Sequence, residues 1–173
     1  MGVNMLLTMG GLILLGTFIL YSNGLLFDNA RIAENNEFVI SAISLAQSVI
    51  DEAKTKSFDQ KAIGATVVSA ESLTVPQALG ADVGELLAVP DTVGQNIPAS
   101  VSRFNDVDDY NGYTRVVNTS RAENYMVQTT VSYASETNPD SIKTSRTFCK
   151  RMAVTVTSPY IPYPVKIMYA FVY

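Results

Sequence analysis

The chain has 173 residues, with 12 Lys and Arg against 16 Asp and Glu, one Cys and no His. A net charge of −4 without any basic run offers no surface for phosphate groups, so we expect no nucleic-acid partner. The absence of histidine excludes catalytic triads and His-ligated zinc sites, and a single cysteine excludes an intrachain disulfide.

Motifs typical of enzymes are also missing from the sequence. It contains no Gly-rich phosphate loop, no nucleophile elbow and no kinase signature. Chemistry based on a Ser–Lys pair or on paired carboxylates stays formally open. We expect a protein that is not an enzyme and that needs no cofactor.

The first segment, residues 1–27, contains no Asp, Glu, Lys or Arg. As a helix it would cover about 40 Å, enough to cross a hydrocarbon core of about 30 Å. A secretory signal peptide fits poorly, because no basic region precedes the apolar run and no small-residue cleavage site follows it. We predict a transmembrane or filament-core helix, and an ordinary single-pass anchor explains the hydropathy equally well.

Glycine is unusually frequent in this segment for a helix. Each glycine in a helix interior is about 1 kcal/mol less favourable than alanine. The segment is therefore predicted to loosen or melt easily, although membrane helices also tolerate glycine. The candidates for melting are Gly10, Gly11, Gly16, Asn23 and Gly24.

Residues 28–58 are predicted to continue the helix in amphipathic form. Apolar side chains recur at spacings of three and four in two adjacent rows. The rows, apolar except at Asn36, are Ile32, Asn36, Val39, Ile43, Ala46, Ile50 and Ala53, and Phe38, Ala42, Leu45 and Val49. A coiled-coil dimer is the alternative, but a face of this width suits packing on a sheet better.

Residues 59–173 are predicted to form a loop-rich stretch followed by an antiparallel sheet. Three of the seven prolines lie between residues 60 and 112. Alternating patterns then predict strands at 113–120, 124–135, 146–157 and 164–173. The fold class is α+β, with the amphipathic helix on an antiparallel meander.

The last predicted strand is apolar on both faces. We therefore expect it to be a central strand covered on both sides. The alternative is that one of its faces meets a neighbouring subunit.

An acidic cluster precedes the strands in the sequence NDVDDYNGY. Its oxygen ligands Asp106, Asp108, Asp109 and Asn111 suit Ca²⁺ chemically, although the EF-hand pattern fails because Val107 occupies the first ligand position. A turn closed by Asx hydrogen bonds is an equally good interpretation.

Two further side chains have weaker signals. Asn118 begins an Asn-Thr-Ser acceptor pattern for N-glycosylation, a pattern that also arises by chance. Cys149 is expected to be a small buried side chain and not a reactive thiol.

The sequences ISLAQSVIDEAKTKSFD (43–59), FNDVDDYNGY (104–113) and FCKRMAVTVTSPY (148–160) carry a resemblance to a known family. With the uncharged N-terminal helix, they resemble type IV pilins and type II secretion pseudopilins, above all minor-pilin-like proteins. The resemblance implies a lollipop-like subunit of an extracellular filament, inserted in the membrane before an inner-membrane machinery assembles it with copies of itself. The filament-core residues would be Met5, Leu6, Leu7, Leu12, Ile13, Leu14, Leu15, Phe18, Ile19 and Leu20.

The chain departs from that family at two places. Position 5 is Met5, where the family usually has a glutamate that pairs with a neighbour's terminal amine. No short basic leader ending in glycine precedes the apolar run, so either Met1 is a processed N-terminus or export differs. A secretion-system pseudopilin, a minor tip subunit and a single-pass surface domain are the alternatives.

Overall fold

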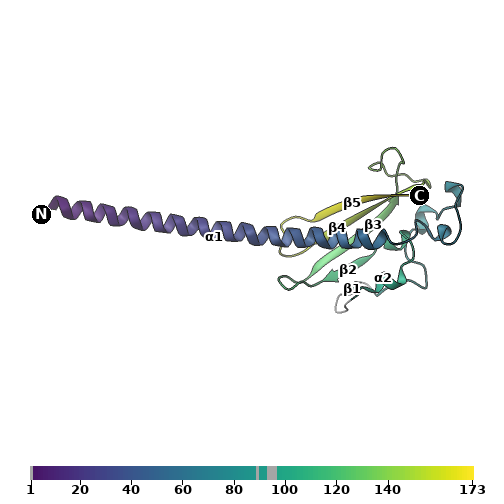
Figure 1. Cartoon of the computed structure of the whole chain (residues 1–173), viewed down its shortest axis with the longest axis horizontal. Coiled ribbons are helices and arrows are strands. Elements are labelled where there is room, and N and C mark those ends of the chain that lie inside the picture. The colour runs from purple at the N-terminus through teal and green to yellow at the C-terminus, as the bar shows by residue number, and fades with distance from the viewer. Residues whose placement is uncertain (1, 89, 93–96) are drawn as a thin grey trace. The chain divides into compact units, whose positions relative to one another are not determined.

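The computed structural model describes residues 2–88, 90–92 and 97–173 (Figure 1). Met1, which belongs to the first predicted segment, lies outside the described residues. The chain divides into two units, residues 1–38 and residues 39–173. One helix, α1 (Gly2–Ala53), belongs to both, as expected from a helical periodicity that no proline interrupts before Pro76. We call residues 39–173 the C-terminal domain.

Within the C-terminal domain, α1 is covered along one face, as its apolar rows predict. The buried positions Ala42, Ala46, Val49, Ile50 and Ala53 follow spacings of three and four, and three of the five are alanines. The small side chains allow the helix backbone to approach the sheet closely. At the start of the predicted rows, Ile32 is exposed.

Helix α1 ends at Ala53, five residues before the predicted end at 58. The reason is a backbone pairing with a distant segment. The Ser57 N–H donates to the Asn105 carbonyl at 3.0 Å, and the Val107 N–H donates to the Ser57 carbonyl at 2.9 Å. These bonds require extended backbone at Ser57, so the helix cannot continue through it.

The sheet contains the four predicted strands in the predicted antiparallel order. They are β2 (Thr114–Val117), β3 (Tyr125–Tyr133), β4 (Cys149–Thr157) and β5 (Val165–Val172). A fifth, two-residue strand that the sequence did not predict, β1 (Asp91–Thr92), pairs parallel with β2. The α+β class, with a long helix on an antiparallel meander, is confirmed.

The alternation of β3 places every second side chain in the core. Tyr125, Val127, Val131 and Tyr133 are buried, whereas Thr130 between them is exposed. Facing β3, the side chains of Met152, Val154 and Val156 in β4 are also buried. The period-two prediction for these strands is therefore correct.

The prediction that the last strand is central is wrong. The strand order β1-β2-β3-β4-β5 makes β5 an edge strand that pairs only with β4. Met168, Tyr169 and Val172 are 49%, 39% and 70% exposed. The apolar residues of β5 thus lie largely on the surface of the domain and do not form a second core layer.

The stretch predicted as loops is organised by short helical turns. These are η1 (Gln60–Ala62), η2 (Ala70–Ser72), η3 (Pro76–Ala78), α2 (Ala99–Arg103) and η4 (Asp108–Tyr110). A small apolar cluster of Val67, Leu73 and Leu79 anchors this stretch against Tyr133 of β3.

Candidate functional site

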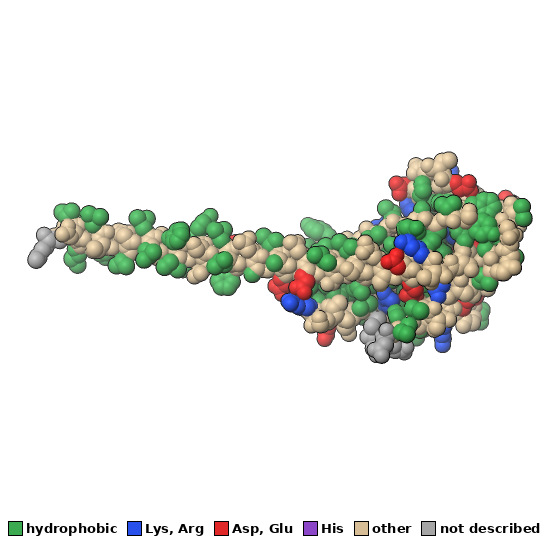
Figure 2. Space-filling view, viewed as in Figure 1, with side chains coloured by type: hydrophobic (Ala, Val, Ile, Leu, Met, Phe, Trp, Pro, Cys, Tyr) green, Lys and Arg blue, Asp and Glu red, His purple; other side chains and the backbone are tan. Residues whose placement is uncertain are grey.

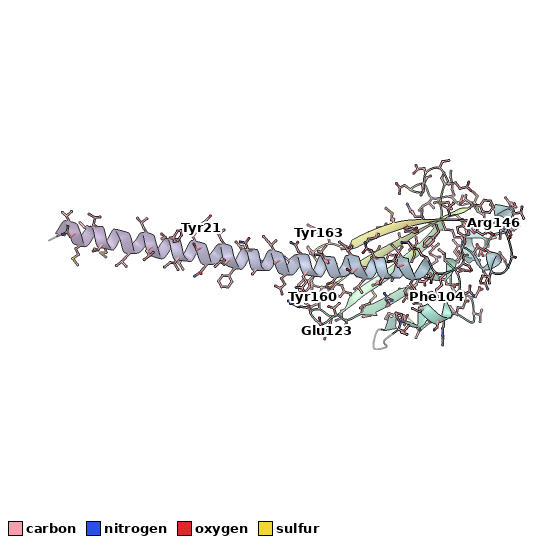
Figure 3. The ribbon with its side chains drawn as sticks, in the orientation of Figure 1. Tyr21, Phe104, Glu123, Arg146, Tyr160 and Tyr163 are labelled. Carbon is pink, nitrogen blue, oxygen red and sulfur yellow. The ribbon has the colours of Figure 1, made fainter. Side chains whose placement is uncertain are left out.

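The first candidate site is the surface of residues 2–27, which we call the apolar segment. Its ten predicted filament-core side chains are all between 49% and 74% exposed. Hydrophobic side chains cover this part of α1 in Figure 2, and the 70% exposed Tyr21 projects from it in Figure 3. A window of this helix has a mean hydropathy of 2.0, so by length and composition it is suited to crossing a membrane.

The glycines of the apolar segment have no packing role within the described chain. A Cβ atom added to Gly10, Gly11, Gly16 or Gly24 would meet no atom within 4 Å. All four, and Asn23, lie inside the continuous helix. Their predicted melting stays a prediction.

The acidic cluster forms a buried turn. The Asp106 carboxylate accepts from the backbone N–H groups of Asp108 and Asp109, and the Asp109 carboxylate accepts from those of Asn105 and Asp106. These are the hydrogen bonds of an Asx-type turn, the alternative to the calcium site. Among the described residues, no group of three or more His, Cys, Asp or Glu is arranged to hold a metal ion.

Asn111 does not join these carboxylates as a ligand. Its side-chain N–H donates to the Leu79 carbonyl at 2.9 Å, and its side-chain oxygen accepts from the Val131 N–H at 3.0 Å. One end of the amide therefore holds the turn to the end of η3 and the other end holds it to β3.

Burial raises the pKa of the Asp106 carboxyl to about 8, and the neighbouring charges of Asp108 and Asp109 add to the effect. Only 1% of Asp106 is exposed, so water cannot compensate its charge. Asp106 is thus a carboxyl group whose neutral form the fold favours.

The sequence did not reveal the most unusual site of the domain, a buried lysine between two carboxylates. Lys150 Nζ lies 2.7 Å from Asp59 Oδ2 and also contacts Asp108 Oδ1. The three side chains are 0%, 0% and 3% exposed. The rings of Phe58 and Tyr133 enclose the ammonium group, with centroids 4.5 and 5.3 Å from Nζ. We call Lys150, Asp59 and Asp108 the buried triad.

Asp59 is held as a carboxylate by many donors. The N–H groups of Lys61 and Thr74 and the Thr74 hydroxyl donate to it, in addition to Lys150. The Tyr133 hydroxyl lies 3.3 Å from Asp59 and donates more closely, at 2.6 Å, to the Thr74 carbonyl. Burial alone would raise the pKa of Asp59, but the hydrogen bonds from Lys150 and the backbone outweigh burial and hold it below its ordinary value.

Asp108, in contrast to Asp59, receives few hydrogen bonds. Its Oδ1 contacts Lys150, while its Oδ2 is buried and accepts no hydrogen bond from the described residues. Burial raises the pKa of Asp108 to about 6 despite the nearby ammonium group. The pKa values of the two carboxyl groups of the buried triad are therefore shifted in opposite directions.

Asp59 precedes η1, Asp108 begins η4 and Lys150 is the second residue of β4. The sequence did contain one sign of the triad. Lys150 alternates with the apolar residues Phe148 and Met152, so all three side chains are expected on the same face of the strand. A lysine on the inward face of a strand needs a buried partner. Those partners are 91 and 42 residues away in the sequence, so a local sequence pattern cannot identify them.

A second buried cation joins α1 to β2. Arg115 is 5% exposed, and its guanidinium group lies 3.7 Å from the Glu52 carboxylate and donates to the Ser48 hydroxyl at 3.1 Å. The Tyr110 hydroxyl donates to Glu52 at 2.8 Å. These contacts fix the second half of the helix on the domain.

The remaining predicted sites lie apart from the buried triad or outside its chemistry. Asn118 is exposed just after β2, and its side-chain oxygen accepts from the Asn124 N–H at 2.9 Å. Its glycosylation stays a prediction. Cys149 is buried, and burial raises the pKa of its thiol, as expected of an unreactive cysteine.

Any function assigned to the chain has to come from its own residues. No protein-family model, no curated protein and no solved structure matches it.

Proposed function

We propose that the chain is a structural subunit that polymerises through the apolar segment into an extracellular filament similar to a type IV pilus. One observation carries the proposal. The apolar segment exposes its whole surface, whereas the C-terminal domain buries a core of its own. A continuous exposed apolar surface of this extent needs lipid or other copies of the chain to cover it.

Assembly in this proposal exchanges lipid for protein. Before assembly the apolar segment lies in a membrane, where its uncharged side chains are at low cost. In the filament the same side chains pack against the apolar segments of neighbouring subunits. Each leucine so buried contributes roughly 1.5–3 kcal/mol relative to exposure in water, which keeps the polymer stable outside the membrane.

Registration of the subunits cannot use a charge in the apolar segment. No ionisable side chain precedes Asp28 apart from Tyr21, and Met5 is 72% exposed. The proposal therefore assigns registration to shape and to contacts between C-terminal domains. The exposed apolar residues of the edge strand, such as Met168 and Val172, are suited to such a contact.

A single-pass anchor for a surface domain is the second candidate. The mean hydropathy of 2.0 and the length of α1 favour it as much as they favour a filament. A pseudopilin or minor tip subunit would use the same helix in a shorter assembly. Neither alternative calls for catalysis, and we propose no enzyme activity for this chain.

Electron microscopy of material sheared from the cell surface distinguishes these functions. We expect filaments whose main component, identified by mass spectrometry, is this chain. A chain found only in the membrane fraction, with no filament containing it, would contradict the proposal and favour the anchor. A chain present at one copy per filament end would favour the tip subunit.

A further inference from the structure

The buried triad brings together the three groups that an amide-forming reaction needs. Lys150 supplies a primary amine, and its Nζ contacts Asp108 Oδ1 and lies 2.7 Å from Asp59 Oδ2. The side chains of all three residues are at most 3% exposed. Holding an amine and a carboxyl group together replaces a bimolecular step by a unimolecular one, with effective molarities of about 10⁵–10⁸ M when the reacting atoms are well oriented.

The surroundings of Nζ are apolar on the sides not occupied by oxygen. The rings of Phe58 and Tyr133 lie over the ammonium group, and the Phe58 carbonyl accepts from Nζ at 2.8 Å. In such a site the separated charges are costly, because water cannot solvate them. Converting one ammonium and one carboxyl into a neutral amide removes that cost.

The two carboxyl groups are differentiated in the way this reaction requires. Asp59 receives hydrogen bonds from two backbone N–H groups and from the Thr74 hydroxyl, so it is the carboxyl group that stays ionised and has a lone pair to take a proton. Asp108 keeps one oxygen without a hydrogen-bond donor among the described residues. The raised pKa of Asp108, about 6, increases the fraction of this carboxyl group that is in the protonated, electrophilic form.

We propose that Lys150 and Asp108 join covalently through an intramolecular isopeptide bond, with Asp59 as the base. Asp59 takes one proton from the Lys150 ammonium, and the free amine attacks Asp108 Cγ. The Nζ–Cγ bond forms and one Cγ–Oδ bond breaks. The hydroxyl leaves as water with a second proton from Nζ, and the amide retains the third. The step needs no oxidant and no co-reactant.

The departing water has a place to go. Asp108 lines a cavity of about 10 Å³ together with Gln60, Thr74 and Asp106. A cavity of that size corresponds to about one water molecule. Its walls carry carboxyl and hydroxyl groups that can hydrogen-bond the water before it exchanges with solvent.

The bond would tie β4 to η4 and so fasten the stretch from η1 to η4 onto the sheet. It closes a loop of 42 residues in a chain whose only cysteine cannot form an intrachain disulfide. Cross-links of this kind stabilise a fold mainly by restricting the unfolded chain. This inference concerns the C-terminal domain alone and does not depend on the proposed filament.

Mass spectrometry of the full chain after denaturation and trypsin digestion tests the bond. We expect residues 104–115 and 147–151 to be recovered as one linked pair, one water lighter than their sum, with no cleavage after Lys150. Fragmentation of the pair should place the link at Asp108. Recovery of these peptides unlinked from the folded wild-type chain would overturn the proposal. A link between Lys150 and residues 57–61 would overturn the choice of Asp108.

Three substitutions separate the roles. Asp59→Asn keeps both reacting groups but removes the base, so the linked pair should be lost. Asp108→Asn should still react and release ammonia in place of water, which the mass of the whole chain reports. Asp109→Asn changes a neighbouring carboxyl in the same peptide and should leave the link intact. Linkage that persists in full in Asp59→Asn would contradict the role of Asp59.

Discussion

Buried charge is concentrated at a few side chains of the C-terminal domain, and their surroundings determine what each can do. The charge of Lys150 is compensated by two carboxyl groups. Asp59 accepts hydrogen bonds from many donors, whereas Asp108 accepts few. Asp106 lies beside them with no cation in direct contact in the described structure. Taking charges out of water costs several kcal/mol per ion unless partners compensate. At that buried position the neutral form of Asp106 therefore has a lower free energy than the ionised form.

The protonation of Asp106 makes the stability of the domain depend on pH between about 6 and 8. The pKa of Asp106 is raised from 3.8 to about 8, so the folded state holds a proton that the unfolded state has lost. The stabilisation from this proton is fully present below the pKa that Asp106 has in the unfolded chain. It is lost as the pH rises through the pKa of Asp106 in the folded chain. We expect the free energy of unfolding, measured with urea, to fall by about 2 kcal/mol across this window.

The window separates Asp106 from Asp108 and Asp59, while the pKa of Glu85 is raised as well, by burial and by the neighbouring Asp109. Asp108 contributes little in this window, because the free carboxyl group has a pKa of about 6 and an amide with Lys150 does not titrate, and the contribution of Asp59 is lost only in acid. The chain has no histidine to titrate here. Asp106→Asn keeps an oxygen to accept the turn hydrogen bonds and should give a flat profile, while Asp140→Asn, at an exposed position, should keep the wild-type slope. An unchanged slope in Asp106→Asn would show that another group is responsible.

Secondary structure was predictable wherever a single periodicity dominates. The apolar rows of residues 39–53 and the alternation of β3 are local patterns, so each could be read without knowing its partner. Burial of Tyr125, Val127, Val131 and Tyr133 follows directly from that alternation.

Features that depend on distant partners were not predictable. Helix α1 ends at Ala53 because Ser57 pairs with Asn105 and Val107, a contact that no local pattern reveals. The edge position of β5 depends on strand order, and its two apolar faces suggested a central strand instead. The buried triad likewise requires residues 42 and 91 positions apart to meet.

The centre of β4 offers a test of the core. Met152 is fully buried, between Val131 of β3 and Tyr169 of β5 in register. Met152→Ala should lower the free energy of unfolding by about 2–5 kcal/mol, because it removes apolar contacts and leaves a cavity. Thermal or urea unfolding measures this.

Met168 provides the matched control on the neighbouring strand. It is 49% exposed, so Met168→Ala should change the free energy of unfolding by only about 0.5 kcal/mol. Equal losses for the two substitutions would mean that β5 is covered in solution, for instance by a neighbouring copy.

Considered as a whole, the chain is built for two environments. The apolar segment has a continuous hydrophobic surface with no Asp, Glu, Lys or Arg, and all 28 of these residues follow it. The C-terminal domain buries its own core and carries its charges on its surface or in compensated clusters. In the proposed function, lipid or protein covers the first part and the second part faces water.

In the proposed filament, the apolar segment has to stay free of charged side chains. Leu15 is 56% exposed in the single chain, and in a filament it would be buried among the helices of neighbouring subunits. Leu15→Arg places a charge there for which the segment has no partner. The cost of burying it is several kcal/mol in each subunit, repeated along the polymer, so filaments should disappear from sheared material under electron microscopy.

Two controls make this result interpretable. The Leu15→Arg chain must first be found in the membrane fraction, because the same charge can block insertion. Val68→Arg adds an identical charge at a position that is 92% exposed in the C-terminal domain, and it should leave filaments intact. If membrane-inserted Leu15→Arg protein still forms normal filaments, the apolar segments do not pack together in the filament, and the segment is better described as a single-pass anchor.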